Sequence, residues 1–123
     1  MTLRLIVCGG RDYHHVSRAV DVLNTIEREF GALDTIVATG GAKGADSLAL
    51  EWVRQAPDKR SSTIFYAMWR AHGKSAGPIR NQQMLDLFRP DLVVAFPGGA
   101  GTADMTRRAE AASVPVRTIA KAT

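Results

Sequence analysis

Short apolar runs alternate along the chain with segments whose hydrophobic residues recur every three or four positions. Runs of this length are typical of buried strands, and the three-to-four spacing is typical of amphipathic helices. The runs predict strands at residues 3–8, 35–39, 63–68, 92–96 and 116–120. The helical spacing predicts helices at about 16–30, from 45 to just before Pro57, at 78–88 and at 102–112, with a loop at 69–77.

This alternation of strand and helix favours one architecture. Five strands separated by four helices predict a parallel sheet with helices on both faces. Right-handed crossovers between the strands then give a doubly wound sheet. We therefore expect a single α/β domain over residues 1–123, a Rossmann-like three-layer sandwich around a five-stranded parallel sheet with the strand order 3-2-1-4-5.

Composition narrows the class of protein. Of the 123 residues, 46% are hydrophobic and 23% are charged, a balance that excludes intrinsic disorder. No apolar run approaches the ~18 residues of a membrane span, and the chain reaches Arg11 and Asp12 too early for a signal peptide. The one cysteine, Cys8, excludes an intramolecular disulfide and a multi-cysteine zinc site. We expect a cytoplasmic protein with no membrane partner.

The charge balance is mildly basic, with a formal net charge of +4 at pH 7. Lysine and arginine are spread along the sequence, and the nearest neighbours are the pairs Lys59–Arg60 and Arg107–Arg108. Nucleic-acid-binding domains usually gather such charge on one face and add stacking aromatics, whereas only 7% of these residues are aromatic. The charge therefore indicates an ordinary solvated surface, with a few cations that serve an anionic site.

Three segments share the pattern of an apolar strand, then glycines, then a helix. They are CGGRDY at 8–13, TGGAKGAD at 39–46 and FPGGAGTADM at 96–105. Each lies at the carboxyl end of a predicted strand, which is the edge at which open α/β sheets bind ligands. With the strand order 3-2-1-4-5, the strands before the three loops are neighbours, so we expect the loops to converge on one crevice.

Glycine suits such loops because it lets a ligand approach the backbone closely. Free N–H groups at the start of a helix attract phosphate or carboxylate. Three such loops at one sheet edge favour a site for an anionic, phosphate-bearing ligand over simple tight turns. Neither standard fingerprint matches, because Lys43 lacks the spacing of a P-loop and the pattern GxGxxG meets Asp104 in place of its third glycine.

The motifs GGRDY, GGAKGAD, AGPIRNQQM and PDLVVAFPGGAGTADM, in this order, resemble the SLOG superfamily. This Rossmann-like group is named after the DNA-processing Smf proteins and the Lonely Guy cytokinin-activating enzymes, and the sequence resembles its small YspA/YpsA-related family most. The resemblance runs from Leu5 to about Val116. It implies binding of nucleotides or nucleotide-derived ligands, and it implies a ligand class better than it implies a reaction.

The resemblance also suggests roles for single residues. It implies that Arg80 and Asn81 belong to the ligand pocket, and in Lonely Guy enzymes the matching arginine assists cleavage of the N-glycosidic bond. Arg80 is therefore the candidate catalytic residue. Lonely Guy enzymes carry PGGxGTxxE with a catalytic glutamate, but the matching residue here is Met105. A thioether neither moves a proton nor stabilises an oxocarbenium ion, and Asp104 has a different helical azimuth, so the departure argues against phosphoribohydrolase activity.

Four polar or aromatic residues have two interpretations each. Asp12 could accept a hydrogen bond from a ribose hydroxyl or cap the first helix. Asp46 could contact a ribose or stabilise the dipole of the second helix. Thr102 could cap the last helix and also meet a phosphate. Trp69 could stack on a base as part of a lid, or pack on the core as aromatic residues this close to a strand usually do.

The remaining reactive or aromatic side chains fit structural roles. Trp52 has helical spacing with Leu48, which predicts a core position. Cys8 ends the first strand and is expected to be a small buried residue. His14 and His15 are adjacent and cannot share a helix face, so we predict no metal site.

Together these observations predict that the protein binds, and thereby senses, a nucleotide or a nucleotide-derived ligand such as ADP-ribose, an NAD derivative or a nucleoside phosphate. No cofactor is required. A phosphoribohydrolase like the Lonely Guy enzymes remains an alternative, as does single-stranded nucleic-acid binding like that of the Smf proteins, with nucleic acid the less favoured partner. Self-association into a homo-oligomer stays open. The expected ligand-binding residues are Gly9, Gly10, Arg11, Asp12, Gly40, Gly41, Ala42, Lys43, Gly44, Asp46, Arg80, Asn81, Pro97, Gly98, Gly99, Gly101 and Thr102.

Overall fold

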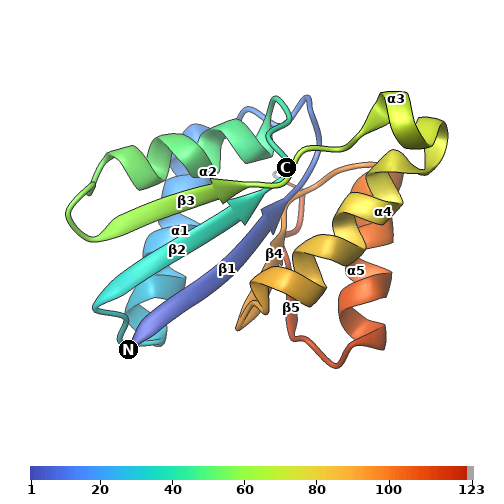
Figure 1. The fold of residues 1–123 in the computed structure, drawn as a ribbon. Coiled ribbons are helices and arrows are strands. Elements are labelled where there is room, and N and C mark those ends of the chain that lie inside the picture. Colours follow the sequence, from blue (N-terminus) through green and yellow to red (C-terminus); the bar gives the residue numbers. More distant parts are fainter. Residues whose placement is uncertain (122–123) are drawn as a thin grey trace.

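A parallel sheet of five strands lies between two layers of helices in the computed structural model, which describes residues 1–121 (Figure 1). In chain order the elements are β1 (Thr2–Cys8), α1 (Val16–Glu29), β2 (Asp34–Thr39), α2 (Ala45–Arg54), β3 (Arg60–Ile64), α3 (Trp69–His72), the 3-10 turn η1 (Gly73–Ser75), α4 (Ala76–Gln83), the π-helical turn η2 (Met84–Phe88), β4 (Leu92–Ala95), α5 (Ala100–Ala111) and β5 (Val116–Thr118).

The strand order is β3-β2-β1-β4-β5, and every neighbouring pair is parallel. The predicted fold class and strand order are therefore confirmed. The chain builds the sheet outward from β1 to β3 and then returns to the other side of β1 to add β4. In sheets of this kind a ligand site lies outside the carboxyl ends of the strands, where the order reverses. Here that point lies between β1 and β4.

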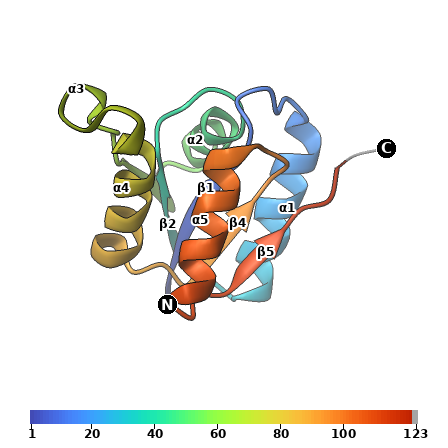
Figure 2. The same cartoon turned by 90° about the vertical axis from the view of Figure 1, so that its right-hand side faces the viewer.

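Alternate side chains of the central strand face opposite layers, as the period of a strand requires. Leu3, Leu5 and Val7 pack in the cluster that α1 and α2 complete, whereas Ile6 packs in the cluster of α4, η2 and α5. Figure 2 shows the two helical layers on either side of the sheet. Among residues 1–121 the structure contains no helix of the length and apolar character needed to cross a bilayer.

The third strand lies earlier than predicted. β3 covers Arg60–Ile64 rather than 63–68, and beyond it only the Phe65 N–H still bonds to β2, donating to the Thr39 carbonyl at 2.9 Å. β3 is an edge strand that pairs with β2 alone, and its residues are exposed or only partly buried. An edge strand tolerates polar residues, so the apolar run did not mark its position.

Other helix and strand boundaries also differ from the predicted ones, in part because the turns contain short helices of their own. The predicted loop at 69–77 contains α3 and η1, and α4 begins at Ala76, two positions before Pro78. The predicted helix at 78–88 ends in η2, after which Arg89 takes a left-handed conformation with φ 53°. α5 begins at Ala100 rather than 102, and β5 ends at Thr118 rather than 120.

A buried ion pair lies where β2 and β3 begin, at the end of the sheet opposite to the glycine loops. The Glu27 carboxylate accepts hydrogen bonds from the Thr35 hydroxyl at 2.7 Å and from the Arg60 guanidinium at 2.9 Å. Lys59 adds a second cation at 3.3 Å, and the Arg60 guanidinium stacks on the Trp52 ring at 3.7 Å from its centroid. The cluster therefore joins α1 and α2 to the first residues of β2 and β3.

Glu27→Gln should lower the free energy of unfolding at pH 7 by about 3–5 kcal/mol, because it leaves the Arg60 charge buried without its partner. Burial raises the pKa of Glu27, but hydrogen bonds from Arg60 and Thr35 outweigh it and hold that pKa below its usual value. The stabilisation is thus complete above the unfolded-state pKa and disappears as the pH falls through the lowered folded-state pKa.

Urea denaturation of both proteins at pH 7 and at acidic pH measures the effect, and the difference between them should shrink in acid. Glu51→Gln is the matched control, because the Glu51–Arg54 pair at 3.5 Å is solvent-exposed and contributes little. Equal losses for the two variants would contradict the interpretation.

Candidate functional site

The turn after β1 is held between the turns after β2 and β4. The Gly10 N–H donates to the Pro97 carbonyl at 2.8 Å, and the Gly10 carbonyl accepts from the Ala45 N–H at 3.1 Å. The three glycine loops are thus joined through their backbones, as the strand order requires. The expected convergence of the loops at one sheet edge is observed.

Several of the glycines are required by this loop-to-loop packing. A Cβ on Gly44 would collide with the Gly10 carbonyl oxygen, and Gly44 also has a positive φ of 77°. A Cβ on Gly98 would lie 2.7 Å from the Gly10 nitrogen. In contrast, a Cβ on Gly99 or Gly101 would meet nothing within 4 Å. Only these last two positions fit the sequence argument that glycine leaves room for a ligand.

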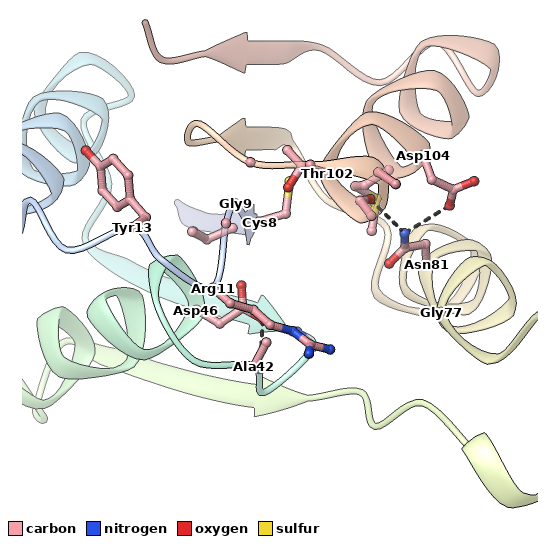
Figure 3. Close-up of a pocket in the computed structure, with 18 of the residues that line it drawn as sticks. Cys8, Gly9, Arg11, Tyr13, Ala42, Asp46, Gly77, Asn81, Thr102 and Asp104 are labelled. Atoms are coloured by element: carbon pink, nitrogen blue, oxygen red, sulfur yellow. Dashed lines mark hydrogen bonds between the residues drawn. The ribbon is translucent and has the colours of Figure 1, made fainter. Parts of the chain in front are cut away.

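The loops surround a cavity of about 1020 Å³ (Figure 3). It extends from the start of α1, where Tyr13 lies, to the start of α4, where Gly77 lies. The predicted site residues that line it are Gly9, Gly10, Arg11, Asp12, Gly40, Ala42, Asp46, Arg80, Asn81, Pro97, Gly98, Gly99, Gly101 and Thr102.

Three predicted residues, Gly41, Lys43 and Gly44, are not part of the cavity wall. Lys43 is exposed, so its charge lies outside the cavity lining, and Gly44 packs against the first loop. The lining residues that were not predicted as ligand-binding are Val7, Cys8, Tyr13, His14, His15, Trp69, Lys74, Gly77, Pro78, Met84, Ala100, Asp104, Met105, Arg107 and Lys121.

Some of these additional lining residues could have been predicted from the sequence. Asp104 and Arg107 lie within two turns of Gly101 on α5, so helical spacing would have placed them near the loop. His14 and His15 directly follow the predicted Arg11–Asp12 pair. Lys121 gave no such signal, because it enters the lining only through the path of the chain after β5.

Asp46 braces the second loop. Its Oδ2 accepts hydrogen bonds from the N–H groups of Gly40 at 3.2 Å and Ala42 at 3.1 Å. Burial raises the pKa of Asp46, opposed by the Ala42 hydrogen bond and by the nearby Arg80 charge. These two N–H groups are therefore engaged within the protein by the Asp46 carboxylate.

Arg80 and Asn81 connect α4 to both sides of the cavity. The Arg80 Nη1 donates to the carbonyls of Gly40 at 3.2 Å and Phe65 at 3.4 Å, and its Nε donates to the Asn81 side chain at 3.0 Å. The Asn81 Nδ2 donates to the Gly101 carbonyl at 3.3 Å and to Asp104 at 3.0 Å. The pair therefore positions the second and third loops relative to each other while it lines the cavity.

The position that matches the catalytic glutamate of Lonely Guy enzymes holds no carboxylate. Met105 is 1% exposed and packs in the apolar cluster of α4 and α5. The neighbouring Asp104 accepts hydrogen bonds from Asn81 and from Arg108 at 2.9 Å. Burial raises the pKa of Asp104, but these bonds and the Arg108 charge hold that pKa below its usual value. Asp104 is thus a paired anion at neutral pH and a poor proton donor.

The capping interpretations of Asp12 and Thr102 are wrong. His15 is the N-cap residue of α1, and no side chain caps that helix. Gly99 is the N-cap of α5, which already includes Thr102, and no side chain caps this helix either. The uncapped start of α5 leaves N–H groups available beside the cavity.

The two tryptophans have different surroundings. Trp52 is fully buried, which confirms its predicted core position, but Trp69 is 55% exposed and does not pack on the core.

Cys8 is partly buried, and burial raises the pKa of its thiol to about 12, so the thiolate is scarce at neutral pH. The rings of His14 and His15 stack at 4.6 Å, and residues 1–121 contain no cluster of three or more acidic, histidine or cysteine side chains suited to a metal.

Comparison with known proteins identifies relatives of the sequence and of the fold. Residues 3–72 match the YspA, cpYpsA-related SLOG family. The sequence is 33% identical over 118 residues to the Gene 61 protein of Mycobacterium phage D29, covering 92% of this chain and 93% of that protein. The fold is similar to that of a UDP-N-acetylglucosamine 2-epimerase, with a TM-score of 0.55 and 12% identity over 97% of this chain. This chain spans only 33% of the epimerase, so the likeness concerns the fold alone.

Two glycine substitutions separate packing from cavity access. Gly44→Ala should destabilise the protein by several kcal/mol, because it combines a clash with the Gly10 carbonyl and a positive φ. Gly101→Ala should leave stability unchanged or raise it by up to about 1 kcal/mol, because the position is helical and open. Thermal unfolding of both variants measures this, and a destabilised Gly101→Ala protein would contradict the assignment of open space there.

Proposed function

Because the chain belongs to the YspA, cpYpsA-related SLOG family and has the Rossmann-like fold of a nucleotide-related protein, we propose that it binds a nucleotide or a nucleotide-derived ligand in the cavity. Binding without turnover suits a sensor. The observation that carries the proposal is the start of α5, where Gly99 and Gly101 present bare backbone to the cavity and no side chain caps the helix. Such a helix start favours phosphate.

The charges around the cavity support an anionic ligand. Arg11, Lys74, Arg107 and Lys121 belong to its lining. Of the carboxylates in the same lining, Asp46 is engaged by backbone N–H groups, Asp104 is engaged by Asn81, Arg107 and Arg108, and Asp12 is exposed. With Arg80, the lining has five cationic side chains against three carboxylates, and this excess of positive charge attracts phosphate before contact and holds it afterwards.

The site supports binding more than hydrolysis of an N-glycosidic bond. That reaction needs a carboxylate to stabilise positive charge on the sugar or to move a proton. The buried Met105 supplies none, and Asp104 is held by its own hydrogen bonds. Arg80 also has two backbone carbonyls as partners, which suits a positioning role.

Isothermal titration with AMP, ADP, ADP-ribose, NAD and a cyclic mononucleotide tests the proposal. We expect saturable binding of at least one of them, weakened about 10- to 150-fold by Arg11→Ala, because a hydrogen bond to a charged group contributes about 1.5–3 kcal/mol. Gly101→Ala should weaken the same ligand, since the added methyl group enters the space beside the uncapped helix start.

Arg54→Ala is the matched control for Arg11→Ala. It removes the same charge from the last turn of α2, outside the cavity lining, where Arg54 forms only an exposed ion pair. Its affinity should stay within about twofold of the unmodified protein, as expected for a screened surface charge. Absence of saturable binding at millimolar concentration of every compound would overturn the proposal, as would equal weakening by the two arginine variants.

A further inference from the structure

Residues 66–75 form an arch beside the cavity, and this arch lacks buried residues. Its ends are fixed. Phe65 is held through its N–H by the Thr39 carbonyl and through its own carbonyl by Arg80, and Ala76 is buried at the start of α4. In Figures 1 and 2 the arch, with α3 at its centre, stands out beyond the sheet. The arch is therefore exposed between two fixed ends.

The arch carries an aromatic side chain into the cavity wall. Trp69 lines the cavity and is 55% exposed, and among the described residues no aromatic ring or cation stacks on it. The opposing position is Gly77, where a Cβ would lie 3.7 Å from Cη2 of Trp69. That distance is an ordinary van der Waals contact, so α4 adjoins the indole at this edge atom. A large apolar ring with an open face beside a polar cavity is suited to a planar ligand group.

The other end of the cavity offers no comparable surface. The His15 ring meets the Tyr13 ring at 5.3 Å and stacks with the His14 ring at 4.6 Å. Tyr13 in turn packs against Phe96 at 5.0 Å. These rings already engage one another, so a base entering the cavity would find its free aromatic face at Trp69.

The arch also has the charge that a nucleotide requires. It contains Arg70 and Lys74, and the sequence has no aspartate or glutamate between Asp58 and Asp86. Lys74 itself lines the cavity. A base at Trp69 would therefore lie beside cationic or neutral groups of the arch.

We propose that Trp69 forms the base-binding subsite of this cavity, stacking on the base of a nucleotide whose phosphate lies at residues 97–102. This inference rests on the proposed function, which it extends from phosphate to base. Stacking tolerates every base because each has a π-face. The subsite therefore distinguishes nucleotides from sugar phosphates, and it discriminates weakly among bases.

A comparison of binding affinities tests this inference directly. The ligands are AMP, GMP, CMP and UMP on one side and ribose 5-phosphate, which lacks only the base, on the other. The nucleotides should bind the unmodified protein more tightly than ribose 5-phosphate. Trp69→Ala should weaken at least one nucleotide about 5- to 150-fold, the range for loss of one base stack, and should leave ribose 5-phosphate unchanged. Nucleotide binding should also change tryptophan fluorescence, because Trp52 is fully buried and Trp69 is the solvent-facing emitter.

Three variants serve as controls. Tyr66→Ala removes an aromatic ring that is 68% exposed on the same arch but outside the cavity lining, and should not change nucleotide affinity. Trp69→Phe should retain most of the affinity because it keeps an aromatic face. His15→Ala should weaken nucleotides less than Trp69→Ala does.

The outcomes separate this inference from the proposed function. If nucleotides and ribose 5-phosphate bind the unmodified protein equally, or if Trp69→Ala weakens both equally, the base subsite is wrong while binding in the cavity stands. If His15→Ala has the larger effect on nucleotides, the base lies at the opposite end and the inference is likewise overturned. If none of these ligands and none of the compounds titrated above binds, the proposed function itself fails. Unchanged thermal unfolding of Trp69→Ala, as expected for an exposed residue, shows that loss of binding is local.

Discussion

The site depends on direct backbone contact between three turns. The first turn touches the second through the Gly10 carbonyl and the Ala45 N–H, and the third through the Gly10 N–H and the Pro97 carbonyl. Side chains would hold these turns apart, so glycine is required where they meet. The parallel pairing of β1 with β2 and β4 brings the turns to the same height, and the glycines then allow them to close together. The cavity lies above this junction.

Arg80 and Asn81 extend the same constraint to α4. Four hydrogen bonds run from this pair to the second loop, to the end of β3 and to the first turns of α5. Each acceptor except Asp104 is a backbone carbonyl, so the connection depends on chain path more than on neighbouring side chains. The arch lies between Phe65 and α4. Because Arg80 joins these two ends, the pair also restricts the position of Trp69.

The fold was predictable because strand and helix periodicity are local properties. The order of the strands was a hypothesis that periodicity did not determine, and the convergence of the glycine loops followed from it; the structure has that order. β3 was misplaced because an edge strand such as RSSTI needs no apolar run. The buried Glu27 was missed as well, since its partners Thr35 and Arg60 are distant in sequence.

The site was predictable as a set of loops but not as a set of contacts. Gly44 and Lys43 match the pattern of an anion loop, yet Gly44 packs on the first turn and Lys43 is exposed outside the lining. Asp46 has a backbone-bracing role that no spacing rule reveals. Of the two interpretations of Trp69, packing on the core is wrong, because β3 ends early and the chain leaves the sheet before reaching this residue.

The packing of Met105 limits whether a single substitution could give this fold a catalytic carboxylate. Its side chain fills the interior beside Ile6, Met84 and Ala109. Met105 also borders the cavity but is only 1% exposed, so a glutamate introduced there would place its carboxyl group in largely apolar surroundings, which disfavour ionisation, next to the anionic Asp104. Introducing hydrolytic chemistry would therefore demand coordinated changes in two helices, not one exchanged residue. In this chain the hydrophobic interior itself occupies the place that such a carboxylate would need.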